Sequence, residues 1–142
     1  MSGGPGQSLA GAPPALRFTR FWWLAGWLMV LFITVSTLEP PQYVPNLHLN
    51  DKLEHATAFF GMTFWFGGLV RRRRYWLLAL WMELFGAGIE IAQGTMGWGR
   101  DMDFWDWVAD TVGVGLALAL LLLAVPRAAG SWMRMVERLL GR

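Results

Sequence analysis

Four long apolar segments constrain this chain more than any other feature of its sequence. They run from about residue 21 to 38, 53 to 70, 75 to 93 and 103 to 125, and prolines, glycines or arginines separate them. Each approaches the roughly 20 residues that a helix needs to cross the hydrocarbon core of a bilayer. Lipid cannot satisfy free backbone groups, so the pattern predicts an all-α integral membrane protein, a bundle of four transmembrane helices.

Composition agrees with this class and excludes several chemistries. Hydrophobic residues make up 55% of the 142 residues, which is more than a soluble domain usually contains. The absence of cysteine excludes disulfides, thiolate metal sites and cysteine nucleophiles. The net charge is positive, but the basic residues flank the apolar segments, so we expect membrane lipids as partners and no nucleic acid.

The chain divides into three parts. Residues 1–16 are rich in Gly, Pro, Ser and Ala and predict a disordered tail. Residues 17–126 form the transmembrane domain, whose first segment is too long for a secretory signal and is predicted to be a retained helix. Residues 127–142 form an amphipathic cytoplasmic tail. Trp132, Met135, Val136 and Leu139 recur there at helical spacing, which predicts a short interfacial helix.

Arginine and lysine positions predict the orientation of the segments. Ten of the 12 basic residues lie before the first segment, between the second and third, or after the fourth. Only Lys52 and Arg100 lie in the other two loops. Cytoplasmic loops carry an excess of Lys and Arg, so we predict cytoplasmic N and C termini in a multi-pass protein of the cell inner (plasma) membrane.

Polar side chains from three segments are predicted to meet in one outward-facing layer. At about 1.5 Å per residue, a helix starting near Tyr75 reaches Glu90 after roughly 22 Å, in the outer third of a core of about 30 Å. His55 and Asp106 enter from outside to a similar depth. Ionisable groups at that depth indicate a functional site or mutual pairing. We expect a ligand-binding site formed by Asp51, Lys52, His55, Glu90, Gln93, Arg100, Asp103 and Asp106.

Two pairs in this layer have structural alternatives that the sequence leaves open. Asp51 and His55 share a helix face and are spaced to grip one ion or one phosphate group. Alternatively, Asn50 or Asp51 caps the helix and a neighbouring carboxylate satisfies His55. Glu90 needs a partner, and Arg100 is the expected one. An ion pair between Glu90 and Arg100 would hold the third and fourth segments together.

Metal and acyl-transfer chemistry have weaker support. One histidine and several carboxylates suit a hard or borderline divalent ion. Their spacing matches no established metal signature, so we assign no metal ligands and expect no cofactor. No serine lies in the layer, which argues against a serine triad. Near mid-membrane, Glu83 is predicted to turn into the bundle, protonated or hydrogen-bonded. Small residues predict close helix approach at Gly61, Gly86, Gly88, Gly113 and Gly115.

Four motifs occur in a distinctive order. A proline-rich loop runs into Asp51-Lys52-x-x-His55, and Glu90-x-x-Gln93, Arg100-x-x-Asp103-x-x-Asp106 and Gly113-x-Gly115 follow. With these motifs the chain resembles the VanZ-like family, named for a glycopeptide (teicoplanin) resistance protein, over about residues 40–120. The resemblance implies a four-helix bacterial cell-envelope protein linked to glycopeptide (antibiotic) resistance. Members typically have Asn at the position of Asp110, so no role is assigned to Asp110 here.

Three functional hypotheses follow. In the first, the layer recognises a lipid headgroup or a lipid-linked envelope precursor, with Arg100, Lys52 and His55 contacting anionic oxygens. In the second, the protein is a metal-assisted membrane hydrolase or transferase, and His55 or Glu90 is its catalytic general base. In the third, it is a non-catalytic structural or interaction protein whose layer locks the helices together. The sequence does not decide between them and does not define an oligomeric state.

Overall fold

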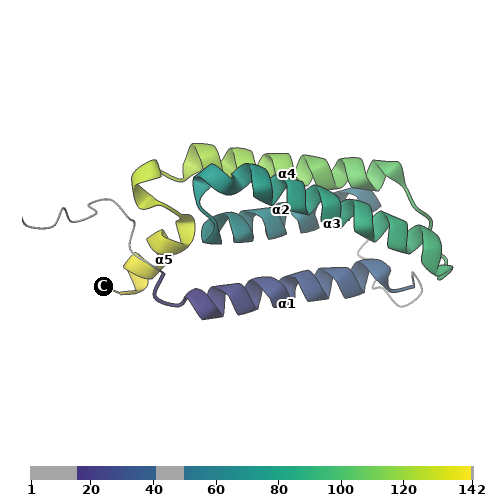
Figure 1. Ribbon diagram of the computed structural model, residues 1–142, viewed down its shortest axis with the longest axis horizontal. Coiled ribbons are helices and arrows are strands. Elements are labelled where there is room, and N and C mark those ends of the chain that lie inside the picture. The colour runs from purple at the N-terminus through teal and green to yellow at the C-terminus, as the bar shows by residue number, and fades with distance from the viewer. Residues whose placement is uncertain (1–15, 41–49, 142) are drawn as a thin grey trace, which may run out of the picture.

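The computed structural model describes residues 16–40 and 50–141, so residues 1–15 of the predicted tail and most of the proline-rich loop lie outside the described residues. All secondary structure in the described part of the chain is helical (Figure 1). The elements are α1 (Thr19–Leu38), α2 (Asp51–Leu69), the 3-10 turn η2 (Arg72–Arg74), α3 (Tyr75–Met96), α4 (Phe104–Ala124), the 3-10 turn η3 (Arg127–Ala129) and α5 (Trp132–Leu140).

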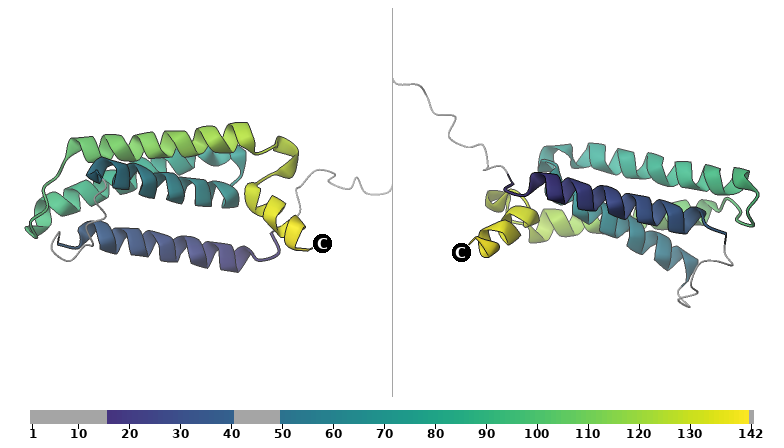
Figure 2. Two further views of the ribbon diagram at one scale, coloured as in Figure 1. Left: turned by 180° about the vertical axis from the view of Figure 1, so that it is seen from behind. Right: turned by 90° about the horizontal axis from the view of Figure 1, so that it is seen from below.

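The four long helices lie side by side, and α5 packs at one end of them (Figures 1 and 2). Helix α2 contacts α1, α3, α4 and α5, and its most extensive contact is with α4, which runs parallel to it. One end, here named the acidic end, gathers the C-termini of α1 and α3 with the N-termini of α2 and α4. The opposite end, here named the arginine end, contains Arg71–Arg74 and α5.

Three of these helical stretches are long and apolar enough to cross a membrane: Thr19–Leu38, Arg72–Met96 and Phe104–Ala124. Helix α2 does not meet this standard, although it was expected to be the second span. Its first turn contains Asp51, Lys52 and Glu54, which lower the mean hydropathy of a helix of only 19 residues. The structure therefore shows a helical protein compatible with a membrane location.

The core lies where α2, α3 and α4 meet. Phe59, Met62 and Phe66 of α2 pack there with Leu78 and Met82 of α3, all less than 9% exposed. By contrast, α1 buries only one glycine, and large apolar side chains cover its outer surface. An apolar surface of this extent is typical of a lipid-facing helix and unusual for a soluble monomer.

Arg72 joins the arginine end to α4 through hydrogen bonds to backbone groups. Arg72 donates hydrogen bonds to the carbonyl oxygens of Leu122 and Val125 near the end of α4. The last carbonyl groups of a helix have no donor within the helix, so Arg72 satisfies two of them. At least this member of the arginine run thus has a structural role in addition to its predicted effect on topology.

Helix α5 is joined to the start of α1 by Glu137. Its Oε2 accepts a hydrogen bond from the amide of Arg17 at 2.7 Å, and its Oε1 accepts from the amide of Phe18 at 3.0 Å and the indole of Trp22 at 2.8 Å. Burial opposes ionisation, but these donors together hold the pKa of Glu137 below its usual value. Met133 is fully buried. Helix α5 is therefore packed into the bundle.

Replacing Glu137 with alanine should destabilise the protein by about 1 kcal/mol, the usual effect of removing a helix cap. Because the folded-state pKa is depressed, this stabilisation is present above the unfolded pKa and is lost as pH falls through the folded pKa. Thermal unfolding in detergent should show a gap between wild type and Glu137→Ala at neutral pH that closes as the pH falls through the depressed pKa of Glu137. Arg138→Ala is the control, and an equal loss in both variants would contradict the assignment.

Candidate functional site

Six polar side chains from three helices meet at the acidic end. Helix α2 contributes two of them from neighbouring turns, α3 contributes one, and the start of α4 contributes three. Spacings of three and four residues keep side chains on one helix face, so each helix turns its members toward the others. We name this group the acidic-end cluster. Its members are Lys52, His55, Glu90, Asp103, Asp106 and Asp110.

Lys52 bridges two carboxylates on the more exposed side of the cluster. Its Nζ lies 2.9 Å from Asp103 Oδ2 and 3.0 Å from Asp106 Oδ1. Asp103 is also the N-cap of α4, because its Oδ1 accepts a hydrogen bond from the amide of Trp105 at 2.8 Å. The Lys52 ammonium, followed by the Trp105 amide, holds the pKa of Asp103 below its usual value. An anionic ligand must compete with both carboxylates for Lys52.

His55 is only 3% exposed and is paired with Asp110. Its Nδ1 lies 2.9 Å from Asp110 Oδ1, while its Nε2 lies 4.0 Å from Asp106 Oδ2. The side chain of Asn50 caps α2 by accepting a hydrogen bond from the amide of Lys52. The structural alternative for this helix start is therefore present: Asn50 is the cap, and a neighbouring carboxylate satisfies the histidine.

Glu90 has a different partner from the one expected. It is 4% exposed, and its Oε2 accepts a hydrogen bond from the amide of Asp103 at 2.9 Å. Arg100 instead donates from Nε to the carbonyl oxygen of Glu39 at 3.0 Å. No salt bridge joins Glu90 to Arg100 in the part of the chain that the structure describes, so the predicted ion pair is wrong. Asp103 precedes a helix N-terminus, where backbone amides lack partners within the helix and are available to a carboxylate.

Two of the predicted site residues bond to the end of α1. Gln93 donates from Nε2 to the carbonyl oxygen of Thr37 at 2.9 Å, and Arg100 donates to Glu39. Asp51 is exposed at the edge of the cluster. Its carboxylate and one ligand atom each of His55 and Asp106 lie within 4.8 Å of one another. Of the eight predicted residues, the structure thus brings together Asp51, Lys52, His55, Glu90, Asp103 and Asp106.

Asp110 completes the cluster although no role was predicted for it. It is fully buried and is the closest partner of His55. Its spacing of four residues from Asp106 already placed it on the same helix face, which was the available signal. The contact between Gln93 and Thr37 had no such signal, because every residue carries a backbone carbonyl.

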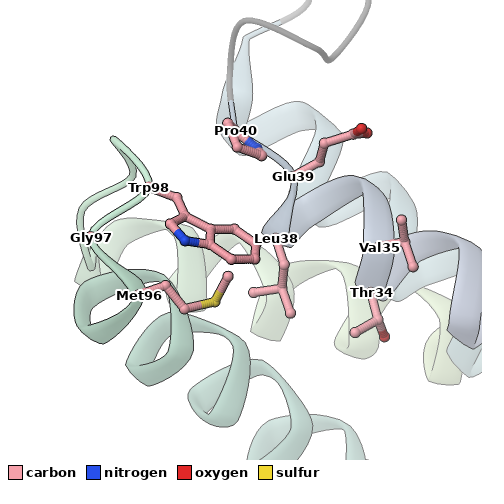
Figure 3. Close-up of a pocket in the computed structure, with 8 residues that line it drawn as sticks. All are labelled: Thr34, Val35, Leu38, Glu39, Pro40, Met96, Gly97 and Trp98. Carbon is pink, nitrogen blue, oxygen red and sulfur yellow. The ribbon is translucent and has the colours of Figure 1, made fainter.

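A cavity of about 800 Å³ lies at the same end of the bundle, between the end of α1 and the turn after α3. In Figure 3, Trp98 and Met96 face Leu38 across it. Glu39 also lines this cavity, and its carbonyl oxygen accepts the hydrogen bond from Arg100, which is not itself a lining residue. Nη1 and Nη2 of Arg100 have no acceptor among the described residues. The cavity has the size of a small-molecule binding site.

Glu83 lies on α3 outside the cluster. Its Oε2 accepts a hydrogen bond from Thr111 Oγ1 at 2.8 Å, and its carbonyl oxygen accepts from Trp107 Nε1 at 3.2 Å. The predicted hydrogen bond of Glu83 is present, but Glu83 is only half-buried and its bond to Thr111 lies at the exposed surface. This contact joins α3 to α4 and leaves Glu83 without a role in the candidate site.

The fold and the site together define a helical protein with an apolar outer surface and a buried polar cluster between helices. Three stretches long and apolar enough to cross a membrane make it compatible with a membrane protein. No protein-family model, curated protein or solved structure matches the chain.

Proposed function

We propose that this chain is a VanZ-like integral membrane protein that crosses the plasma membrane four times. Helix α2 contacts α1, α3 and α4, the three helices that are apolar enough to span. A helix enclosed by spanning neighbours crosses with them, and its charged first turn then lies near the membrane surface. The arginine end is cytoplasmic under the positive-inside rule, so both termini and α5 lie on that side and the acidic end faces outward.

Contacts between separate motifs support the VanZ-like assignment. Lys52 and His55 belong to the first motif, Glu90 to the second, and Asp103 and Asp106 to the third. Lys52 of the first motif bonds to two members of the third across 51 and 54 residues, and Glu90 of the second motif bonds to the amide of Asp103. Their order therefore corresponds to one three-dimensional site.

We infer that the outward-facing site binds a lipid headgroup or a lipid-linked envelope precursor. The observation that carries this inference is the hydrogen bond from Arg100 Nε to the carbonyl oxygen of Glu39, a residue that lines a ligand-sized cavity; Nη1 and Nη2 of Arg100 have no acceptor among the described residues. A guanidinium group binds phosphate or carboxylate oxygens in a bidentate manner. Leu38, Met96 and Trp98 offer an apolar wall to the rest of the ligand. Lys52 and His55 then act chiefly by holding the neighbouring carboxylates, which accept hydrogen bonds from hydroxyl and amide groups.

Replacing Arg100 with alanine should remove a lipid that co-purifies with the protein. Wild type and variant are extracted in mild detergent and compared by lipid mass spectrometry. Loss of a charge-assisted hydrogen bond should lower the bound amount of one anionic species by about tenfold or more. Arg73→Ala, which removes an exposed arginine at the opposite end, is the matched control. Equal retention by Arg100→Ala, or equal loss from the control, contradicts the proposal.

Glycopeptide susceptibility gives these variants a second readout. If the bound species is an envelope precursor, the wild-type protein should raise tolerance to teicoplanin in a susceptible bacterial host. Arg100→Ala should not raise it at the same membrane level, whereas Arg73→Ala should. Failure of Arg100→Ala to reach the membrane would instead support a structural role for Arg100.

A further inference from the structure

Two buried carboxylate oxygens in the acidic-end cluster have no hydrogen-bond partner. They are Glu90 Oε1 and Asp110 Oδ2, and neither contacts a donor among the described residues. The side chains belong to residues that are 4% and 0% exposed. A buried acceptor without a partner destabilises the folded protein, and more so when it is charged. Such groups are rare in native proteins and require a specific explanation.

The same two residues converge with His55 from three different helices. One ligand atom each from His55, Glu90 and Asp110 lies within 4.8 Å of the others. With bonds of about 2.0–2.2 Å from zinc to nitrogen or oxygen, three ligand atoms around one ion lie about 3.3–3.8 Å apart. Side-chain movements of up to about 1 Å therefore bring all three atoms into bonding range.

We propose that His55, Glu90 and Asp110 form a binding site for a divalent transition-metal ion, with Zn²⁺ as the best match. One imidazole and two carboxylates are ligands that zinc accepts, whereas Mg²⁺ prefers six oxygen ligands. A dication balances the two carboxylates, which Lys52 does not neutralise because it is paired elsewhere. Three protein ligands also leave a fourth position open for water or substrate.

A second trio shares the histidine and offers a weaker site. Asp51, His55 and Asp106 also place ligand atoms within 4.8 Å of one another. However, Asp51 is exposed and Asp106 is already bonded to Lys52. Neither Asp51 nor Asp106 has a buried oxygen without a partner. An ion bound by His55, Glu90 and Asp110 would therefore satisfy unpartnered buried oxygens, which an ion bound by the second trio would not.

The metal site shares residues with the proposed headgroup site, but it goes beyond that proposal and does not depend on it. The test uses detergent-solubilised full-length protein stripped with a chelator and titrated with ZnCl₂ alone. Elemental analysis after desalting should find about one zinc ion per wild-type chain, and zinc should raise the thermal unfolding temperature. Both Glu90→Gln and Asp110→Asn should weaken zinc binding by about 10-fold to 100-fold or more.

Control variants locate the ion. Asp101→Asn, at an exposed aspartate outside the cluster, should bind zinc like wild type. Asp51→Asn should also keep its zinc. Circular dichroism checks that each variant is folded. The proposal is overturned if wild type binds no zinc, if Glu90→Gln and Asp110→Asn bind as wild type does, or if only Asp51→Asn loses the ion. Loss of zinc without loss of the co-purifying lipid would leave the headgroup proposal standing.

Discussion

Replacing Gly113 with leucine is expected to prevent stable assembly of the bundle. A side chain at this position would enter the space of the carbonyl oxygen of Ala56 in α2, and its Cβ would lie 3.0 Å from the amide nitrogen of Phe60. These are backbone atoms of a helix and cannot rotate away, so α2 and α4 must separate along their closest contact. We expect a loss of more than about 3 kcal/mol, the upper end of the usual cost of overpacking.

Gly115→Leu is the matched control for this prediction. Gly115 lies on the same helix two residues later, and a Cβ there would meet nothing within 4 Å. Both variants change helix propensity and hydrophobicity equally, so the difference between them isolates the packing contact. Unfolding in a denaturing detergent, followed by circular dichroism, should show wild-type-like stability for Gly115→Leu alone. Equal stability of the two variants would contradict the close contact of α2 with α4.

The glycines show which close helix contacts could be predicted from the sequence. Gly86 and Gly113 lie against neighbouring helices, as predicted, whereas Gly61, Gly88 and Gly115 face open space. A helix turns about 100° per residue, so glycines two positions apart point in nearly opposite directions and cannot both face one neighbour. The composition of a segment predicts that a close approach occurs. Which glycine makes it depends on the rotation of the helix, which the partner determines.

Helix positions were predicted more accurately than helix partners. The third and fourth segments were expected at 75–93 and 103–125, and the helices run over Tyr75–Met96 and Phe104–Ala124. Arginines, glycines and proline limit these segments, and such signals are local. The second helix begins two residues early, because Asn50 caps it and its charged first turn is helical. The polar layer predicted that the starts of α2 and α4 meet, but the extent of their contact is not a local property, so no motif indicated that it is the most extensive one of α2.

In the candidate site, too, the positions of residues were predicted more accurately than their bonding partners. Depth in the helix predicted that His55, Glu90 and Asp106 lie close together, and the structure brings them together. The choice of partners was less accurate, because charge alone favoured Arg100 for Glu90. Backbone amides carry no charge in the sequence, yet the amide of Asp103 is the donor that Glu90 uses. Partners supplied by the backbone are therefore the part of such a site that sequence patterns miss.

Replacing Asp110 with leucine is the second change expected to destabilise the protein strongly. Leucine leaves a buried ring nitrogen of His55 without its partner, which costs about 1–3 kcal/mol, and its branched end must fit where Asp110 lies against Gly86. Asp110→Asn should stay close to wild type, because an amide can donate to or accept from the ring.

Unfolding experiments in a denaturing detergent separate the hydrogen bond of Asp110 to His55 from the packing of Asp110 against Gly86. In protein stripped of metal with a chelator, Asp110→Leu should lose about 3 kcal/mol or more, whereas Asp110→Asn should lose less than about 1 kcal/mol. Adding His55→Ala to each variant tests the pair itself: once the histidine is absent, most of the gap between leucine and asparagine should close. A gap that stays the same without His55 would show that the shape of the residue at position 110, and not its bond to the imidazole, stabilises the contact of α2 with α4.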